Sequence, residues 1–174
     1  GHVGVSRASA AHDYPSRFML VAAMNPCPCG YFNDPQHECR CTQSQILRYQ
    51  RRVSGPLLDR IDIQVGVAAV PFRELMTARP GRPSAEIRME VVRARQIQTE
   101  RYRSMPGVLT NADVRSRDLP TVCRLDLRAQ ENLRRTIERL NLSARAYDRI
   151  LRVARTIADL RGADCVEEMD VMEA

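Results

Sequence analysis

Four of the chain's six cysteines lie within residues 27–41, and this cluster constrains the surrounding fold more than any other feature. The four form two Cys-x-Cys pairs, which are Cys27 with Cys29 and Cys39 with Cys41. Two such pairs joined by a short loop can bring four thiolates around one ion, and a tetrahedron of four sulfurs suits Zn²⁺. The sequence therefore predicts a structural zinc site at these four residues, with free thiols as the alternative.

Two neighbouring residues fit a metal loop. Gly30 follows the first pair and allows the chain to turn tightly, with its amide directed towards thiolate sulfur. His37 stands close to Cys39 and is a reserve ligand if one cysteine fails geometrically. The remaining cysteines, Cys123 and Cys165, lie far along the chain, so we expect them to be ordinary packing residues.

Apolar runs on either side of the cysteines predict a sheet. Residues 18–24 form a short apolar run that stops at Asn25-Pro26, which is typical of a buried parallel strand. Residues 61–70 predict a second central strand, and residues 3–16 predict either a β-hairpin arm or a frayed terminus. Asn25 would then lie at a strand's carboxyl end, where open α/β sheets bind ligands, unless Asn-Pro is simply a turn.

Helical patterns dominate the rest of the chain. A short basic helix is expected over residues 43–53, capped by Thr42 or Ser44. Residues 71–83 are rich in Pro, Gly and Arg and mark a domain boundary, after which residues 84–103 predict a long helix. Further helices are predicted at residues 112–117, after an Asp126 cap to Leu140, after a Ser143 cap to Arg161, and at the C-terminus.

The basic residues limit what the chain can do alone. The sequence has no lysine, so all 27 basic side chains are arginine and the net charge is +6. The phosphate-binding motif GxxxxGK[ST] requires a lysine and is therefore absent. The excess of positive charge favours nucleic acid or nucleotide as a partner. No apolar run approaches the roughly 20 residues that a membrane helix needs, so we expect a cytoplasmic protein with no membrane partner.

Four sequence segments carry a family resemblance: AAMNPCPCGYF, HECRC, SGPLLDRIDI and LSARAYDRILRVARTIADL. Together they resemble the magnesium-chelatase-like branch of the AAA+ ATPases, and most closely its bacterial competence-protein-M group, ComM/YifB. The resemblance implies an α/β plus all-α chain. Residues 1–75 would be the C-terminal portion of an AAA+ ATPase core, and residues 76–174 a helical lid.

The same resemblance implies three site residues. Asn25 corresponds to sensor 1, which positions the attacking water, Arg60 to the arginine finger, and Arg145 to the sensor 2 arginine. The residues alone favour a surface ion pair of Arg60 with Asp59 or Asp62, and only the motif around Arg60 favours the arginine finger. Arg145 could equally belong to a solvated basic ridge, since it shares one helical spacing with Arg149 and Arg152.

The function implied is an ATP- and Mg²⁺-dependent motor, a homo-hexameric ring that migrates DNA branches as a helicase. The alternatives are a chelatase-like protein remodeller, against which the cysteine cluster argues, and a zinc-stabilised nucleic-acid-binding module. Because the phosphate-binding loop is absent, we expect this chain to be the C-terminal part of a longer ATPase and to be inactive in ATP hydrolysis on its own.

Overall fold

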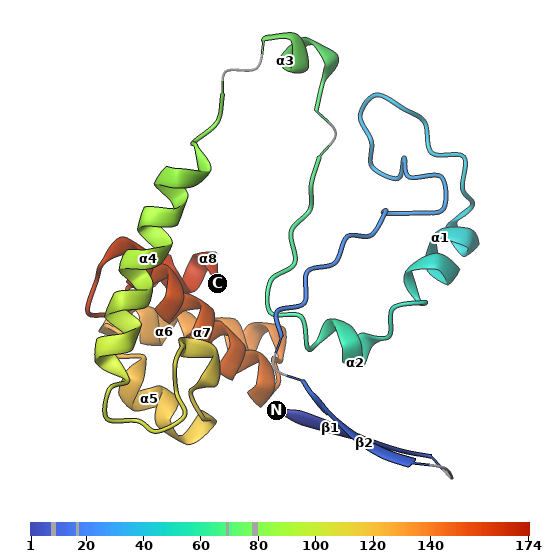
Figure 1. Ribbon diagram of the computed structural model, residues 1–174. Helices are drawn as coiled ribbons and strands as arrows, with labels where there is room; N and C mark the ends of the chain where they lie inside the picture. Colours follow the sequence, from blue (N-terminus) through green and yellow to red (C-terminus); the bar gives the residue numbers. More distant parts are fainter. Residues whose placement is uncertain (8–9, 17, 69, 78–79) are drawn as a thin grey trace. The chain divides into compact units, whose positions relative to one another are not determined.

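The computed structural model describes residues 1–7, 10–16, 18–68, 70–77 and 80–174. The chain divides into two compact units, Gly1–Ser54 and Gly55–Ala174. The first unit holds a small sheet, the cysteine loop and one helix, and the second holds the remaining helices (Figure 1). The division falls at residue 54, whereas the sequence predicts a boundary at residue 75, which stays a prediction.

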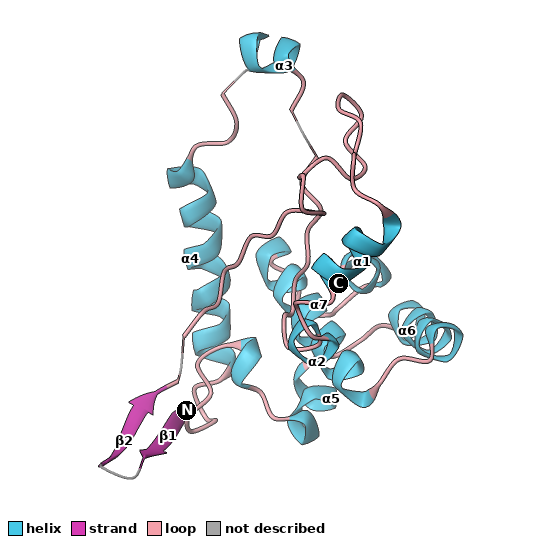
Figure 2. Cartoon of the chain, turned by 90° about the vertical axis from the view of Figure 1, so that its right-hand side faces the viewer, coloured by secondary structure: helices cyan, strands magenta, loops and turns pink. Residues whose placement is uncertain are grey.

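The sheet of the first unit is a two-stranded hairpin (Figure 2). Strand β1 (His2–Arg7) pairs antiparallel with β2 (Ala10–Pro15), from His2 opposite Pro15 to Arg7 opposite Ala10. All residues of both strands are exposed. The predicted hairpin is therefore confirmed, and the frayed terminus is not.

The two predicted central strands are corrected by the structure. Residues 18–24 and 62–68 are not strands, and their side chains are exposed, with Val21 84% and Val67 90% accessible. A strand needs a neighbour to satisfy its N–H and C=O groups. In the described ranges the hairpin is the only sheet, so neither apolar run has a strand beside it. Ala69 lies outside the described residues.

Helix α1 (Gln43–Gln50) begins directly after the cysteine loop. Thr42 is its N-cap: its Oγ1 accepts from the amide of Gln45 at 3.3 Å, and Oε1 of Gln45 accepts from the amide of Thr42 at 2.8 Å. This reciprocal box satisfies two donors that a helix start leaves open. Ile46 is buried, and Nε2 of Gln50 donates to the carbonyl of Pro26 at 3.3 Å, which holds the helix against the loop.

The second unit is helical throughout its regular structure. It contains α2 (Gly55–Leu58), α3 (Phe72–Thr77) and the long α4 (Ser84–Arg101). Two 3-10 turns (Asn111–Asp113 and Ser116–Asp118) replace the helix predicted at 112–117 and lead into α5 (Leu119–Val122). They are followed by α6 (Leu127–Leu140), α7 (Ala144–Arg161) and α8 (Glu168–Glu173).

Local capping fixes the ends of the two best-defined helices. Asp126 caps α6, with its Oδ1 accepting from the amide of Ala129 at 2.6 Å. Ser143 caps α7 by accepting from the amide of Ala146 at 3.2 Å. Gly162 ends α7 with φ of 79°, a left-handed conformation that glycine adopts without strain. The two predicted N-caps, Asp126 and Ser143, are confirmed.

The core of the second unit forms around α7. Leu151, Ala154 and Ala158 are almost fully buried, as the three- and four-residue spacing predicts. Helix α4 contributes only its C-terminal half, since Ala94 is buried while Val91 is 45% exposed, and the N-terminal half projects beyond the cluster (Figure 1). No helix among the described residues is long and apolar enough to cross a membrane.

Candidate functional site

The four clustered cysteines converge in the first unit, as their spacing predicts. Their sulfurs all lie within 4.8 Å of one another. The Sγ atom of Cys39 is 3.8 Å from Cys27 and 3.6 Å from Cys29. A tetrahedral ion with bonds of about 2.3 Å would place its sulfur ligands about 3.8 Å apart. The cluster therefore has the donor set and the spacing to hold a metal ion, and all four thiols are free.

The loop conformation explains how the first pair points inwards. Gly30 has φ of 86° and its amide donates to the carbonyl of Cys27 at 3.1 Å, so it closes the turn, whereas we expected it to face sulfur. His37 does not belong to the cluster: its Nδ1 lies 3.4 Å from Oδ1 of Asp34, and its ring packs on that of Tyr31. A reserve ligand is thus not needed for the four-sulfur set.

Thiol ionisation in the cluster is uneven. Hydrogen bonds from the amide of Tyr31 and from the thiol of Cys27 lower the pKa of Cys29 to about 6. Desolvation and the neighbouring sulfur of Cys29 raise the pKa of Cys41 to about 12. One thiolate thus discourages ionisation of the next. A bound cation would reverse this effect, because its charge favours every thiolate that contacts it.

Asn25 lies in the first unit, two residues before the first cysteine, and is exposed. The segment before it is not a strand and has no strand partner among the described residues, so the expected strand end is not formed there. The role of Asn25 as sensor 1 stays a prediction. Its amide side chain is open to a ligand, which that role requires.

Arg60 lies in the second unit, just after the short helix α2. Its Nη1 donates to the carbonyl of Pro56 at 2.6 Å, and the residue is exposed. Neither Asp59 nor Asp62 forms an ion pair with it in the described ranges, so that alternative is not observed. The guanidinium is held only by one backbone carbonyl of its own segment, which leaves it free to exchange that contact for a ligand.

The basic ridge on α7 is not uniform, which corrects the expectation of a solvated ridge. Arg145 is exposed, and it makes no hydrogen bond or ion pair within the described part of the chain. Arg149 is half-buried and donates to the carbonyls of Asp59 at 3.4 Å and Ile61 at 3.2 Å. Arg152 donates to the carbonyl of Val114 at 3.0 Å. Only Arg145 remains available for a phosphate.

Sequence reasoning missed a buried polar network centred on Asp159. Both terminal nitrogens of Arg101, at the end of α4, donate to this carboxylate, and the Nη1 contact is 2.9 Å long. Nε of Arg155 donates to the same carboxylate at 3.0 Å. Asn111 also donates to it at 2.9 Å. Burial alone would raise the pKa of Asp159, but these donors and the charge of Arg155 hold it below the usual value.

Arg155 itself is completely buried and ties the end of α7 to the following loop. Its terminal nitrogens donate to the carbonyl of Asp164 at 2.8 Å and to that of Ala163. The only sequence signal for this network was an Arg and an Asp four residues apart on α7. That spacing is equally typical of an exposed pair, so burial could not be deduced from it.

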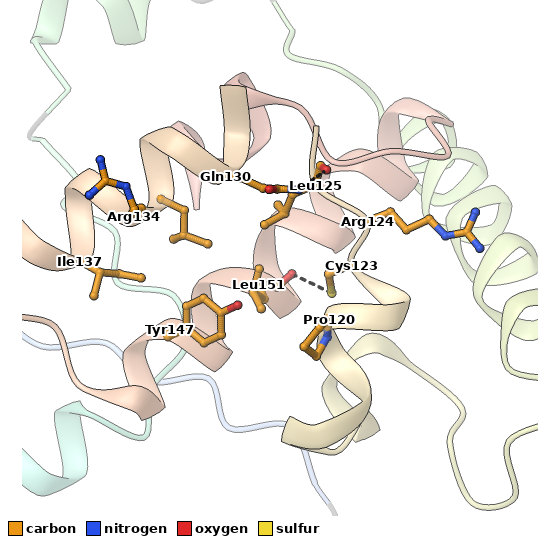
Figure 3. Close-up of a pocket in the computed structure, with 10 residues that line it drawn as sticks. Pro120, Cys123, Arg124, Leu125, Gln130, Arg134, Ile137, Tyr147 and Leu151 are labelled. Carbon is orange, nitrogen blue, oxygen red and sulfur yellow. Dashed lines mark hydrogen bonds between the residues drawn. The ribbon is translucent and has the colours of Figure 1, made fainter. Parts of the chain in front are cut away.

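An open groove of about 580 Å³ lies between α5, α6 and α7 (Figure 3). Its apolar lining includes Ile137, Tyr147 and Leu151, and the charged Arg134 is occupied by Glu138 at 2.8 Å. The thiol of Cys123 donates to the carbonyl of Leu151 at 3.5 Å, and burial raises its pKa to about 11. Cys123 is therefore a packing residue, as predicted, and the groove offers no reactive group.

Comparison with known proteins covers almost the whole chain. The family model described as "Magnesium chelatase, subunit ChlI" matches residues 1–75, and "Magnesium chelatase, subunit ChlI C-terminal" matches residues 81–174. Competence protein ComM of Haemophilus influenzae is 39% identical over all of this chain. The uncharacterized protein YifB of Escherichia coli is 38% identical over the same span.

A relative from Mycobacterium tuberculosis, the uncharacterized protein Rv2897c, is 38% identical over 93% of this chain. The chain spans 33% of ComM and of YifB and 31% of the mycobacterial relative, so it represents about a third of their length. The resemblance first seen in four short segments is thus confirmed along the full chain. The chain belongs to the magnesium-chelatase-like family, in the group that includes ComM and YifB.

Proposed function

We propose that this chain is the C-terminal part of an AAA+ ATPase that drives DNA branch migration as a homo-hexameric helicase. The observation that carries the proposal is its 39% identity, over its whole length, to a relative named as a competence protein. The proposed ring would bind ATP and Mg²⁺ between subunits. Its α/β core would include residues 1–75, and its helical lid residues 76–174.

Three exposed side chains would act on the nucleotide. Asn25 would hold the attacking water in its own subunit, and Arg60 would reach the terminal phosphate bound by the neighbouring subunit. An arginine suits this task because its planar, permanently charged fork stabilises charge that develops in phosphoryl transfer. Arg145 lies in the first turn of α7, where backbone amides also favour phosphate, and would couple the lid to nucleotide state.

Zn²⁺ is the metal that we propose for Cys27, Cys29, Cys39 and Cys41. Four thiolates in a closed tetrahedral set are typical of structural zinc, and such a site contributes folding energy rather than catalysis. The net charge of +6, all from arginine, supports contact with a polyanion such as DNA.

The decisive experiment measures ATP hydrolysis and branch migration by the intact protein, with and without branched DNA, beside an Arg60→Ala variant. DNA-stimulated turnover that falls about 10³-fold or more in the variant is expected for an arginine finger. Arg139→Ala, which removes an exposed arginine from α6, is the matched control and should retain turnover.

Two other outcomes would redirect the proposal. Turnover that is indifferent to DNA would favour the chelatase-like protein remodeller. DNA binding without any ATP hydrolysis by the intact protein would favour a zinc-stabilised nucleic-acid-binding module. The present chain alone, which lacks the phosphate-binding lysine, is expected to hydrolyse no ATP.

A further inference from the structure

Helix α7 forms hydrogen bonds to the segment that carries Arg60 through the side chain of Arg149. Arg149 donates through Nη1 to the carbonyl of Asp59 and to the carbonyl of Ile61, at 3.4 and 3.2 Å. These two carbonyls stand on either side of Arg60 in the chain. One guanidinium thus holds the backbone immediately before and immediately after the proposed finger.

Within the described part of the chain, the other hydrogen bonds of this segment are local. The amides of Asp59, Arg60 and Ile61 donate to carbonyls of α2 at 2.9, 3.0 and 3.0 Å. The segment contributes no residue to the buried core of the second unit. Its placement against α7 therefore depends strongly on the Arg149 contact. A loop packed into the core would depend less on any one side chain.

Arg149 also lies one helical turn after Arg145 on α7. The helix that presents the proposed sensor 2 arginine therefore also anchors the proposed finger. From this arrangement we propose that Arg149 is a positioning residue, which fixes the Arg60 segment on α7 so that the finger moves as one body with that helix. The inference rests on the proposed function, because it assigns Arg149 to the support of Arg60.

The chemistry favours arginine over lysine here. Both carbonyls are reached from Nη1, and the two N–H donors of that nitrogen have fixed directions because the guanidinium is planar. A lysine would keep the charge and one flexible donor group but lose that fixed geometry. Arg149→Lys should therefore retain part of the function, and Arg149→Ala should lose it.

The test uses the intact protein and compares Arg149→Ala and Arg149→Lys with the Arg139→Ala control. A misplaced catalytic group costs up to about 100-fold in rate, so we expect the alanine variant to lose about 10- to 100-fold in kcat. KM for ATP should change less than about twofold, because the finger contributes to the transition state more than to binding. The kcat of the lysine variant should lie between that of the alanine variant and that of the unchanged protein. Ring assembly should be unchanged in both variants.

Subunit mixing separates this role from a general structural one. In a head-to-tail ring, each site would combine Asn25 of one subunit with Arg60 of its neighbour. Mixed equally with Asn25→Ala subunits, Arg149→Ala subunits should regain activity at about a quarter of the sites, since half the sites are intact and half of those face an intact finger.

The outcomes separate a failure of the proposed arginine finger from a failure of the positioning role of Arg149. Arg60→Ala mixed with Asn25→Ala is the reference pair, and failure of that pair to recover would count against the proposed finger itself. Recovery by that pair but none with Arg149→Ala, in rings that assemble normally, would overturn the positioning role. Full turnover by Arg149→Ala alone would overturn it as well.

Discussion

Asp159 and Arg155 lie one turn apart on α7 with both side chains completely buried, and the carboxylate accepts from Nε of the guanidinium at 3.0 Å. Arg101 from α4 adds a second cation to the same carboxylate, which balances part of the desolvation cost. This cluster connects α4 to α7 through two residues, Arg101 and Asp159, that are 58 positions apart in the chain. It is therefore a determinant of how the helical unit is assembled.

Removal of the carboxylate should be severe. Asp159→Ala leaves two guanidinium groups without their anion, and breaking a buried pair costs about 3–5 kcal/mol. We expect chemical denaturation of the second unit to show a loss of that size. Glu138→Ala, which breaks only an exposed pair with Arg134, should leave the denaturation midpoint unchanged. Equal losses in the two variants would contradict this account.

The same carboxylate predicts acid sensitivity. Its pKa is lower in the folded state than its ordinary value of 3.8, so the folded state binds the proton less readily than the unfolded state. The resulting stabilisation is fully present above the ordinary value and is lost as the pH falls through the lowered pKa. Denaturation followed from pH 6 downwards should show this loss in the native chain, and Asp159→Asn should remove that part of the pH dependence.

Metal content tests the cysteine cluster directly. The purified protein should contain about one zinc per chain, and a double replacement, Cys27→Ser with Cys29→Ser, should abolish it. Cys165→Ser is the matched control because Cys165 lies in the other unit and donates to the carbonyl of Arg124. The zinc prediction would be wrong if the purified protein contained no metal and were as stable as protein supplied with zinc.

Arg145 provides a further test in the intact protein. If it contacts a nucleotide phosphate, Arg145→Ala removes a charged hydrogen bond worth about 1.5–3 kcal/mol, and ATP affinity should weaken about 10- to 100-fold. Fluorescent nucleotide titration would measure this, with Arg139→Ala again as the control. The helical unit should melt at the same temperature, since Arg145 is exposed and makes no hydrogen bond or ion pair within the described part of the chain. Unchanged ATP affinity would show that Arg145 does not contact the nucleotide and is an ordinary exposed residue.

The features predicted correctly from sequence are those decided by near neighbours. Ser143 and Asp126 cap helices through amides three residues away, and the cysteine pairs meet across one short loop. The two central strands were predicted wrongly because strand pairing depends on segments that are distant in the sequence. No described segment pairs with residues 18–24 or 62–68. The buried Arg155 was missed for the same reason, since its burial depends on α4 and on the loop after α7.

The capping box on Thr42 has a consequence for how the first unit responds to loss of metal. Helix α1 has 8 residues, whereas an isolated helix in water needs about 12–15 to persist. Its N-cap, Thr42, directly follows Cys41, so a metal that fixes Cys41 would also help the costly nucleation step of that helix. The proposed zinc would therefore promote the nucleation of a helix that is too short to form alone. Removal of the zinc by a chelator should selectively unfold residues 43–50.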